Sequence, residues 1–203
     1  MAVDSNSCVV YLFPMTRPKL VSDDAILDAA RHVMLQPRQE PFTLADVAHE
    51  VGLSRAAIIQ RFKNKEQLQL LVAERGNRQL SEYLATLPKG NSARDAWNFL
   101  QNLIYAMGSS DRLPELLMMI KDDMVHPGLN RIARQRNQLV RDAIAERLPV
   151  DDPDARSEKA SLLQAVLQGS SLQWGIDRQG EQKAFMARQV EHALRVMFPS
   201  TPL

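Results

Sequence analysis

The sequence has a single cysteine, Cys8, among its 203 residues, so a disulfide within one chain is excluded. An unpaired cysteine suits a reducing compartment, and we expect a cytoplasmic protein. No apolar run approaches the ~18 residues that a membrane helix needs, so no membrane partner is predicted. The net charge is only +1, so overall charge favours no class of partner, and an argument for nucleic-acid binding depends on where the cations lie.

The sequence also lacks the patterns that catalysis or metal binding would require. Its eight glycines never occur in the G-x-G spacing of a phosphate-binding loop, and Gly169-Ser170-Ser171 lacks the spacing of a hydrolase nucleophile elbow. Four histidines are scattered without the spacing of metal ligands: His32, His49, His126 and His192. We therefore expect no catalytic residue, metal ion or cofactor, and an all-α enzyme is the less favoured alternative.

Helical spacing is what the sequence does contain. Prolines divide the chain, apolar residues recur at intervals of three and four, and alternating β-branched runs are almost missing, which predicts an all-α fold. We expect a flexible N-terminal tail over residues 1–21, a helix-turn-helix DNA-binding domain over 22–68, and a larger helical effector-binding and dimerisation domain over 69–203. Within the tail, Met1 and Met15 are both possible starts, so whether residues 1–14 belong to the native protein is left open.

The segment from Thr43 to Leu68, TLADVAHEVGLSRAAIIQRFKNKEQL, is the most informative. Thr43, followed three residues later by Asp46, predicts a capping box at the start of a short helix. Gly52 can adopt the positive φ of a tight turn, and Ser54 can cap the next helix. The small side chain of Ala48 allows the two helices to cross closely. This spacing predicts a helix-turn-helix whose second helix projects for insertion into a major groove.

The charges of the second helix agree with that prediction. Between residues 55 and 65 the chain has four cations and no acid: Arg55, Arg61, Lys63 and Lys65. A charge run alone is usually a solvated helix face. Combined with the turn, it predicts DNA binding, because each neutralised phosphate releases counterions.

Residues 22–70, about a quarter of the chain, resemble the N-terminal signature of the TetR family of regulators. The matching runs are Ile26–Ala30, Asp46–Ala48, Val51–Ser54 and Phe62–Leu68. The resemblance implies a homodimeric transcriptional regulator, most often a repressor, that binds a palindromic double-stranded DNA operator and is released by a small-molecule effector. The chain departs from the family where aromatic residues are usual, at Ile59–Arg61, so Ile59 cannot make a tyrosine's phosphate contact.

The resemblance also implies roles for matching residues. Thr43 and Lys65 would contact phosphates, Arg55 with its neighbouring alanines would face base edges, and Gln60 and Arg61 would contact the flanking backbone or a base. The complete predicted set is Thr43, Ser54, Arg55, Ala56, Ala57, Gln60, Arg61, Lys63 and Lys65.

An effector pocket is implied among the later helices, where apolar, aromatic and methionine residues are common. We expect it to include Trp97, Ile104, Tyr105, Met118, Met124 and Trp174, with ordinary core packing as the alternative for each.

The last two helices are candidates for a dimer interface. An apolar ridge is followed there by small residues, which would let a partner helix approach closely. The predicted interface residues are Leu163, Val166, Leu167, Ser170, Val190 and Leu194, and the alternative is that the ridge packs within one chain. Three other functions stay open: an activator, a DNA-binding protein without an inducer, and an all-helical adaptor.

Overall fold

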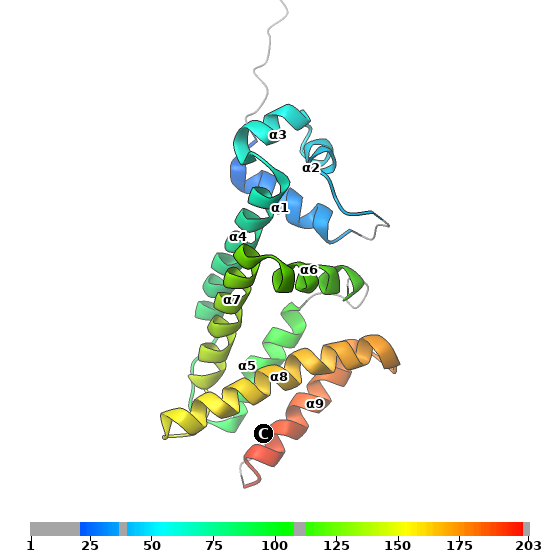
Figure 1. Ribbon diagram of the computed structural model, residues 1–203. Helices are drawn as coiled ribbons and strands as arrows, with labels where there is room; N and C mark the ends of the chain where they lie inside the picture. The colour runs from blue at the N-terminus through cyan, green and yellow to red at the C-terminus, as the bar shows by residue number, and fades with distance from the viewer. Residues whose placement is uncertain (1–20, 37–39, 108–112, 201–203) are drawn as a thin grey trace, which may run out of the picture.

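A computed structural model of the protein describes residues 21–36, 40–107 and 113–200 (Figure 1). Within these ranges the chain forms nine helices and no strand, which confirms the all-α prediction. Residues 1–20 of the predicted tail lie outside the described ranges. The helices are α1 Asp23–Met34, α2 Leu44–Glu50, α3 Arg55–Phe62, α4 Lys65–Thr86, α5 Ala93–Ala106, α6 Leu113–Val125, α7 Pro127–Ala145, α8 Pro153–Asp177 and α9 Gln182–Met197.

Side-chain caps start several of the helices, including the two predicted at Thr43 and Ser54. Each cap accepts a hydrogen bond of 2.8 to 3.3 Å from the backbone N–H three residues later, which satisfies one of the free donors of the first turn. The capping residues are Ser22, Thr43, Ser54, Asn64 and Asp152. Helix α8 ends at Asp177, and the next residue, Arg178, takes a left-handed conformation with φ 48°.

The helices enclose two separate apolar cores. Helices α1, α2 and α3 pack with the first part of α4 around Ile26, Val47 and Ile58, which are completely buried. The second core is formed by the rest of α4 with α5, α7, α8 and α9. Helix α4 takes part in both cores, and Figure 1 shows it running beside α7 from one to the other. The predicted domain boundary, between residues 68 and 69, thus lies inside a continuous helix.

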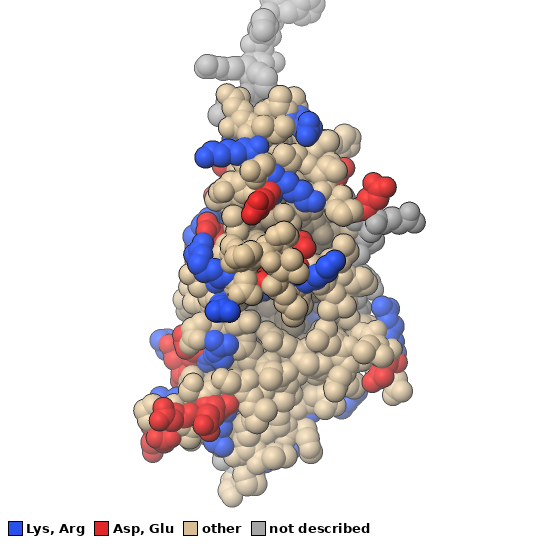
Figure 2. All heavy atoms as spheres, viewed as in Figure 1, with Lys and Arg blue, Asp and Glu red and all other residues tan. Residues whose placement is uncertain are grey.

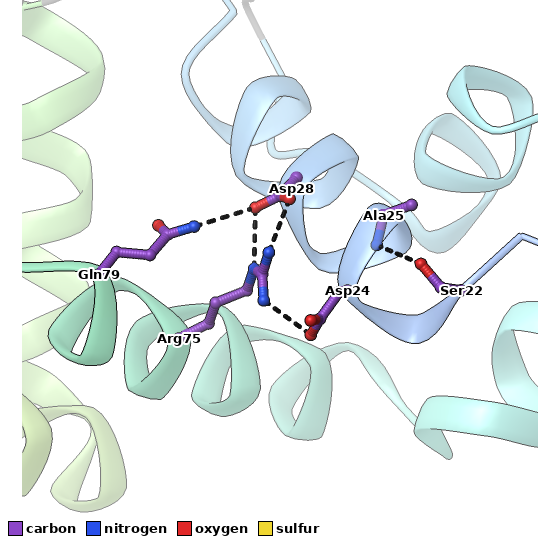
Figure 3. Close-up of polar contacts among 6 residues, drawn as sticks. All are labelled: Ser22, Asp24, Ala25, Asp28, Arg75 and Gln79. Atoms are coloured by element: carbon purple, nitrogen blue, oxygen red, sulfur yellow. Dashed lines mark hydrogen bonds and ion pairs between the residues drawn. The ribbon is translucent and has the colours of Figure 1, made fainter. Parts of the chain in front are cut away.

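One arginine on α4 ties the N-terminal helices to it (Figure 3). Nε and Nη2 of Arg75 donate to the two carboxylate oxygens of Asp28, each at 2.9 Å, and Nη1 lies 2.7 Å from the carboxylate of Asp24. Gln79 adds a weaker bond to Asp28. The hydrogen bonds from Arg75 lower the pKa of Asp28. Bidentate pairing of this kind also restricts orientation, so α1 is held in one position along α4.

The opposite side of α4 contacts α6 and α7. Asn77 Nδ2 donates to the Ile132 carbonyl on α7 at 2.9 Å. At Gly128, the second residue of α7, an added Cβ would lie 2.8 Å from a methyl of Leu70, so the glycine permits a close approach. Helix α4 is therefore in direct contact with both the N-terminal helices and the larger helical part.

The predicted dimer ridge is part of the core of the single chain. Leu163, Val190 and Leu194 are completely buried, Leu167 and Ser170 nearly so, and Val166 packs against the same core. The α8 members of this set pack toward α7 and α9, and the α9 members pack toward α5 and α8, so the single chain already covers most of their surface. Their positions agree with the alternative given above, in which the ridge packs within one chain. None of the described helices is both long and apolar enough to cross a membrane.

Candidate DNA-binding surface

Helices α2 and α3 form the predicted helix-turn-helix. The capping box has both of its bonds: the Asp46 N–H donates to Thr43 Oγ1 at 3.3 Å, and the Thr43 N–H donates to Asp46 Oδ2 at 2.7 Å. Gly52 has φ +66°, the conformation for which glycine was expected there. Ala48 is buried where the two helices meet. The turn therefore follows from local chemistry that is visible in the sequence.

Helix α3 presents a polar face at the end of the molecule (Figure 1). Ile58 and Phe62 point inward and are buried, which fixes the rotation of the helix about its own axis. The opposite face includes Arg55, Ala56 and Gln60, all exposed. A short helix that is anchored on one side and exposed at its N-terminal end is what readout of base edges in a major groove requires.

An open groove of about 510 Å³ lies between the start of α3 and the start of α4. Its described lining residues are Pro41, Phe42, Thr43, Leu44, Arg55, Ile59, Lys63, Asn64 and Lys65. Three of these are cations and none is an acid. The groove thus brings together four of the predicted contact residues, and its charge suits a phosphate backbone.

The chain between α3 and α4 makes a γ-turn that the sequence analysis did not predict. Lys63 has φ 65° and ψ −62°, and the Asn64 N–H donates to the Phe62 carbonyl at 2.7 Å. This positive-φ turn is rare and strained for an L-residue. The sequence gives one signal for this turn: a single residue, Lys63, separates Phe62, which ends α3, from Asn64, which caps α4.

Lys65 and Phe42 form a contact that sequence reasoning also missed. The Lys65 ammonium lies 4.3 Å from the centre of the Phe42 ring, within the range of a cation–π interaction. Phe42 precedes the capping residue of α2, and Lys65 is the first residue of α4, so 22 residues separate them along the chain. Phe42 is buried in the N-terminal core, which fixes its ring.

Arg61 has partners within the protein. Its Nη1 donates to the Val21 carbonyl at 2.5 Å and lies 3.4 Å from an oxygen of Asp23. The side chain is only 25% exposed and does not line the groove. In this position Arg61 ties the end of α3 to the start of α1, whereas the family resemblance implied a contact with the DNA backbone or a base.

Figure 2 shows how charge is distributed over one face. Lysine and arginine side chains lie across the part formed by the N-terminal helices and α4, with isolated acids between them. The largest group of acids on this face lies at the lower left, where Figure 1 shows the start of α8. On this face the largest acidic group therefore lies away from the N-terminal helices, which contain the groove.

The predicted effector-pocket residues are dispersed. Ile104 and Tyr105 line one small hollow of about 70 Å³, between the end of α5 and the start of α9. Trp174 is buried against the α8–α9 turn, where its Nε1 donates to the Gly180 carbonyl, and Trp97 packs against the larger core. The remaining two, Met118 and Met124, are exposed on α6. A hollow this small is well below the ~300–1,000 Å³ of ligand pockets.

Residues 26–72 match the family model described as "Bacterial regulatory proteins, tetR family". The matched segment begins in α1 and ends in α4, so it contains the helix-turn-helix and the groove. The comparison with curated proteins produced no match.

Solved structures of similar fold extend over nearly the whole chain. A transcriptional regulator from Rhodococcus sp. is 17% identical with a TM-score of 0.70, covering 88% of this chain and 96% of that one. A protein described as a TetR-family regulator, from Mesorhizobium loti, is 14% identical with a TM-score of 0.68 and coverage of 88% and 95%. The regulator FadR from Bacillus subtilis, in complex with stearoyl-CoA, is 13% identical with a TM-score of 0.62 and coverage of 83% and 96%. The N-terminal segment of the chain thus matches the tetR family model, and its overall fold is similar to that of solved transcriptional regulators.

Proposed function

We propose that the protein binds a palindromic DNA operator as a homodimer and represses transcription until a small molecule releases it. The observation that supports this best is the acid-free groove beside α3, which Thr43, Arg55, Lys63 and Lys65 line together. These side chains come from the starts of three helices and the turn between two of them.

Each part of the surface has a distinct role in this proposal. Arg55, exposed in the first turn of α3, can donate two hydrogen bonds to a guanine in the major groove, and the methyl group of Ala56 can contact a thymine methyl. Lys63 and Lys65 contact phosphates on the other side of the groove, which sets the orientation of α3 without reading sequence. Gln60, exposed further along α3, can reach a base or a phosphate.

Salt dependence tests the phosphate contacts. The affinity for a fluorescein-labelled duplex of mixed sequence is measured by anisotropy over a range of salt concentrations. Lys65→Met should make the slope of log affinity against log salt shallower by about 0.9, because the variant neutralises one phosphate fewer. Lys89→Met is the matched control, because Lys89 is 76% exposed just beyond the other end of α4. Binding without salt dependence, or equal slopes for both variants, would contradict the proposal.

The outer face of α8 supports a homodimer with a different set of residues from those predicted. Leu162, Leu172 and Ile176 are exposed, and Ala165 and Gly169 lie between them at spacings of three and four residues. Nothing lies within 4 Å of where a Cβ on Gly169 would be. An apolar stripe with small residues at its centre is self-complementary, since an identical helix can approach closely about a twofold axis. We propose a second copy of this chain as its occupant.

Charge placed on the stripe tests the dimer. Ile176→Glu should shift the protein to a monomer in sedimentation velocity and weaken binding to a palindromic duplex. Gln135→Glu, at an exposed position on α7, adds the same charge elsewhere and should change neither. A wild-type protein that sediments as a monomer at micromolar concentration would contradict the dimer proposal.

An amphipathic acyl compound is the effector that we propose to test first. The solved FadR structure is in complex with stearoyl-CoA. In this chain, helix α6 has several exposed apolar side chains: Leu117, Met118, Ile120 and Met124. An effector should raise the melting temperature and weaken DNA binding together, because the two equilibria are linked. A compound that changes only one of them is not the inducer, and a protein that no acyl compound affects would favour regulation without such an effector.

A further inference from the structure

We propose that Phe42 is a positioning residue for DNA binding, whose ring holds the Lys65 ammonium at the groove where a phosphate can meet it. The inference rests on the proposed function, because it concerns the same groove. It adds a residue that contacts no base or phosphate and acts through the lysine.

The two partners differ in mobility. Phe42 is only 7% exposed and packs in the N-terminal core, so its ring cannot follow the lysine. Lys65 is half-buried on a flexible side chain, and its Nζ lies 4.3 Å from the ring centre. Both residues line the groove together with Thr43, which follows Phe42 directly. The ring therefore restricts an otherwise mobile cation at the place where the helix starts of α2 and α4 meet.

The position of Lys65 in α4 is unfavourable for helix stability alone. As the first residue of the helix it adds a positive charge to the positive end of the helix dipole, where acids such as the following Glu66 are preferred. Among the described residues Lys65 has no ion pair, and the described contact of its ammonium is the aromatic ring. Contact with a ring leaves the full charge of the ammonium available for an anion, whereas a carboxylate would neutralise it.

The physical consequence is a smaller entropic cost of binding. A lysine that is fixed on a phosphate loses rotamer freedom, and a lysine that the ring already restricts has less to lose. At a partly exposed site, the strength of such contacts corresponds to a change of about two- to five-fold in affinity. We therefore expect Phe42 to contribute an effect of this size, and only while Lys65 is present.

Fluorinated analogues of phenylalanine at position 42 test this without changing the shape of the core. Successive fluorine atoms weaken the negative face of the ring, so the dissociation constant for a mixed-sequence duplex at low salt should rise stepwise, by about two- to five-fold in total. In a Lys65→Met background the same analogues should leave the dissociation constant unchanged. Phe42→Tyr, which keeps an aromatic face, should retain wild-type affinity. Thermal unfolding of each protein reports whether the core is intact.

The outcomes separate this inference from the proposed function. If the dissociation constant is constant across the analogues, or rises equally with and without Lys65, Phe42 is only a core residue and the inference is overturned. In that case salt-dependent binding that weakens on Lys65→Met still supports the proposed function. If the wild type does not bind the duplex at low salt, the proposed function fails and the inference fails with it.

Discussion

Replacing Lys63 with glycine should stabilise the fold and weaken DNA binding at the same time. The backbone of Lys63, with φ 65° and ψ −62°, lies in a region that a Cβ disfavours, and glycine adopts it freely. The lysine side chain is exposed and lines the groove. The backbone of this residue thus costs stability, while its charge serves the proposed contact with DNA.

The size of the stability change follows from two opposing effects. Relief of the strain should contribute about 1–3 kcal/mol to the free energy of unfolding. The greater freedom of glycine in the unfolded chain should remove roughly 0.5–1 kcal/mol. The net gain is then on the order of 1 kcal/mol, which raises the melting temperature by roughly 2–4 °C for a chain of this length. The salt dependence of DNA binding should become shallower by about 0.9, because glycine cannot neutralise the phosphate that Lys63 is proposed to meet.

The matched variant is Lys63→Ala, which removes the same charge and keeps the strain. Chemical denaturation and calorimetry of both variants give the two stabilities, and anisotropy gives the two salt slopes. At an ordinary position glycine is less stable than alanine, so a Lys63→Gly protein that is more stable than Lys63→Ala is the expected sign of strain. If the glycine variant is the less stable of the two, the reasoning from the γ-turn is refuted.

Three further predictions concern the fold. Gly76, within α4, has nothing within 4 Å of an added Cβ and no positive φ, so Gly76→Ala should raise the free energy of unfolding by about 0.8–1 kcal/mol in urea titrations; Gly52→Ala, at φ +66°, should lower it. Leu163→Ala should lower the free energy of unfolding by about 2–5 kcal/mol because Leu163 is completely buried, whereas its exposed neighbour Leu162, when truncated, should leave the stability of a single chain nearly unchanged. Asp28 has a lowered pKa in the folded protein, so its contribution to stability is present above its unfolded pKa of about 4 and is lost as the pH falls through the lower folded value. The difference in free energy of unfolding between wild type and Asp28→Asn should therefore shrink in acid. A difference that stays constant with pH would exclude the Arg75 pairing as its cause.

Local patterns in the sequence predicted much of the fold. The predicted caps at Thr43 and Ser54 and the turn at Gly52 depend on contacts between residues at most five apart in the chain. The predicted helix-turn-helix and the match over residues 26–72 rest on the same short-range pattern. Such features can be predicted because the interacting groups are brought together by the helix geometry itself.

The sequence could not separate the two apolar faces of α8. Leu162 and Leu163 are adjacent and chemically identical, yet Leu163 is completely buried and Leu162 is 55% exposed. Which of them faces α9 depends on the rotation of the helix, and that is set by packing against residues more than twenty positions away, such as Val190 and Leu194. The predicted dimer ridge was therefore placed on the face that the single chain buries.

By itself, the sequence determined where helices begin and turn, and that a cationic helix follows the turn at Gly52. Only the tertiary structure decided that Arg61 binds Val21 within the protein, that Lys65 meets the ring of Phe42, and that Arg75 joins α4 to α1. The physical reason is distance along the chain. The two partners in each of these contacts lie more than twenty residues apart, so their meeting depends on how whole helices pack, and no local spacing reports it.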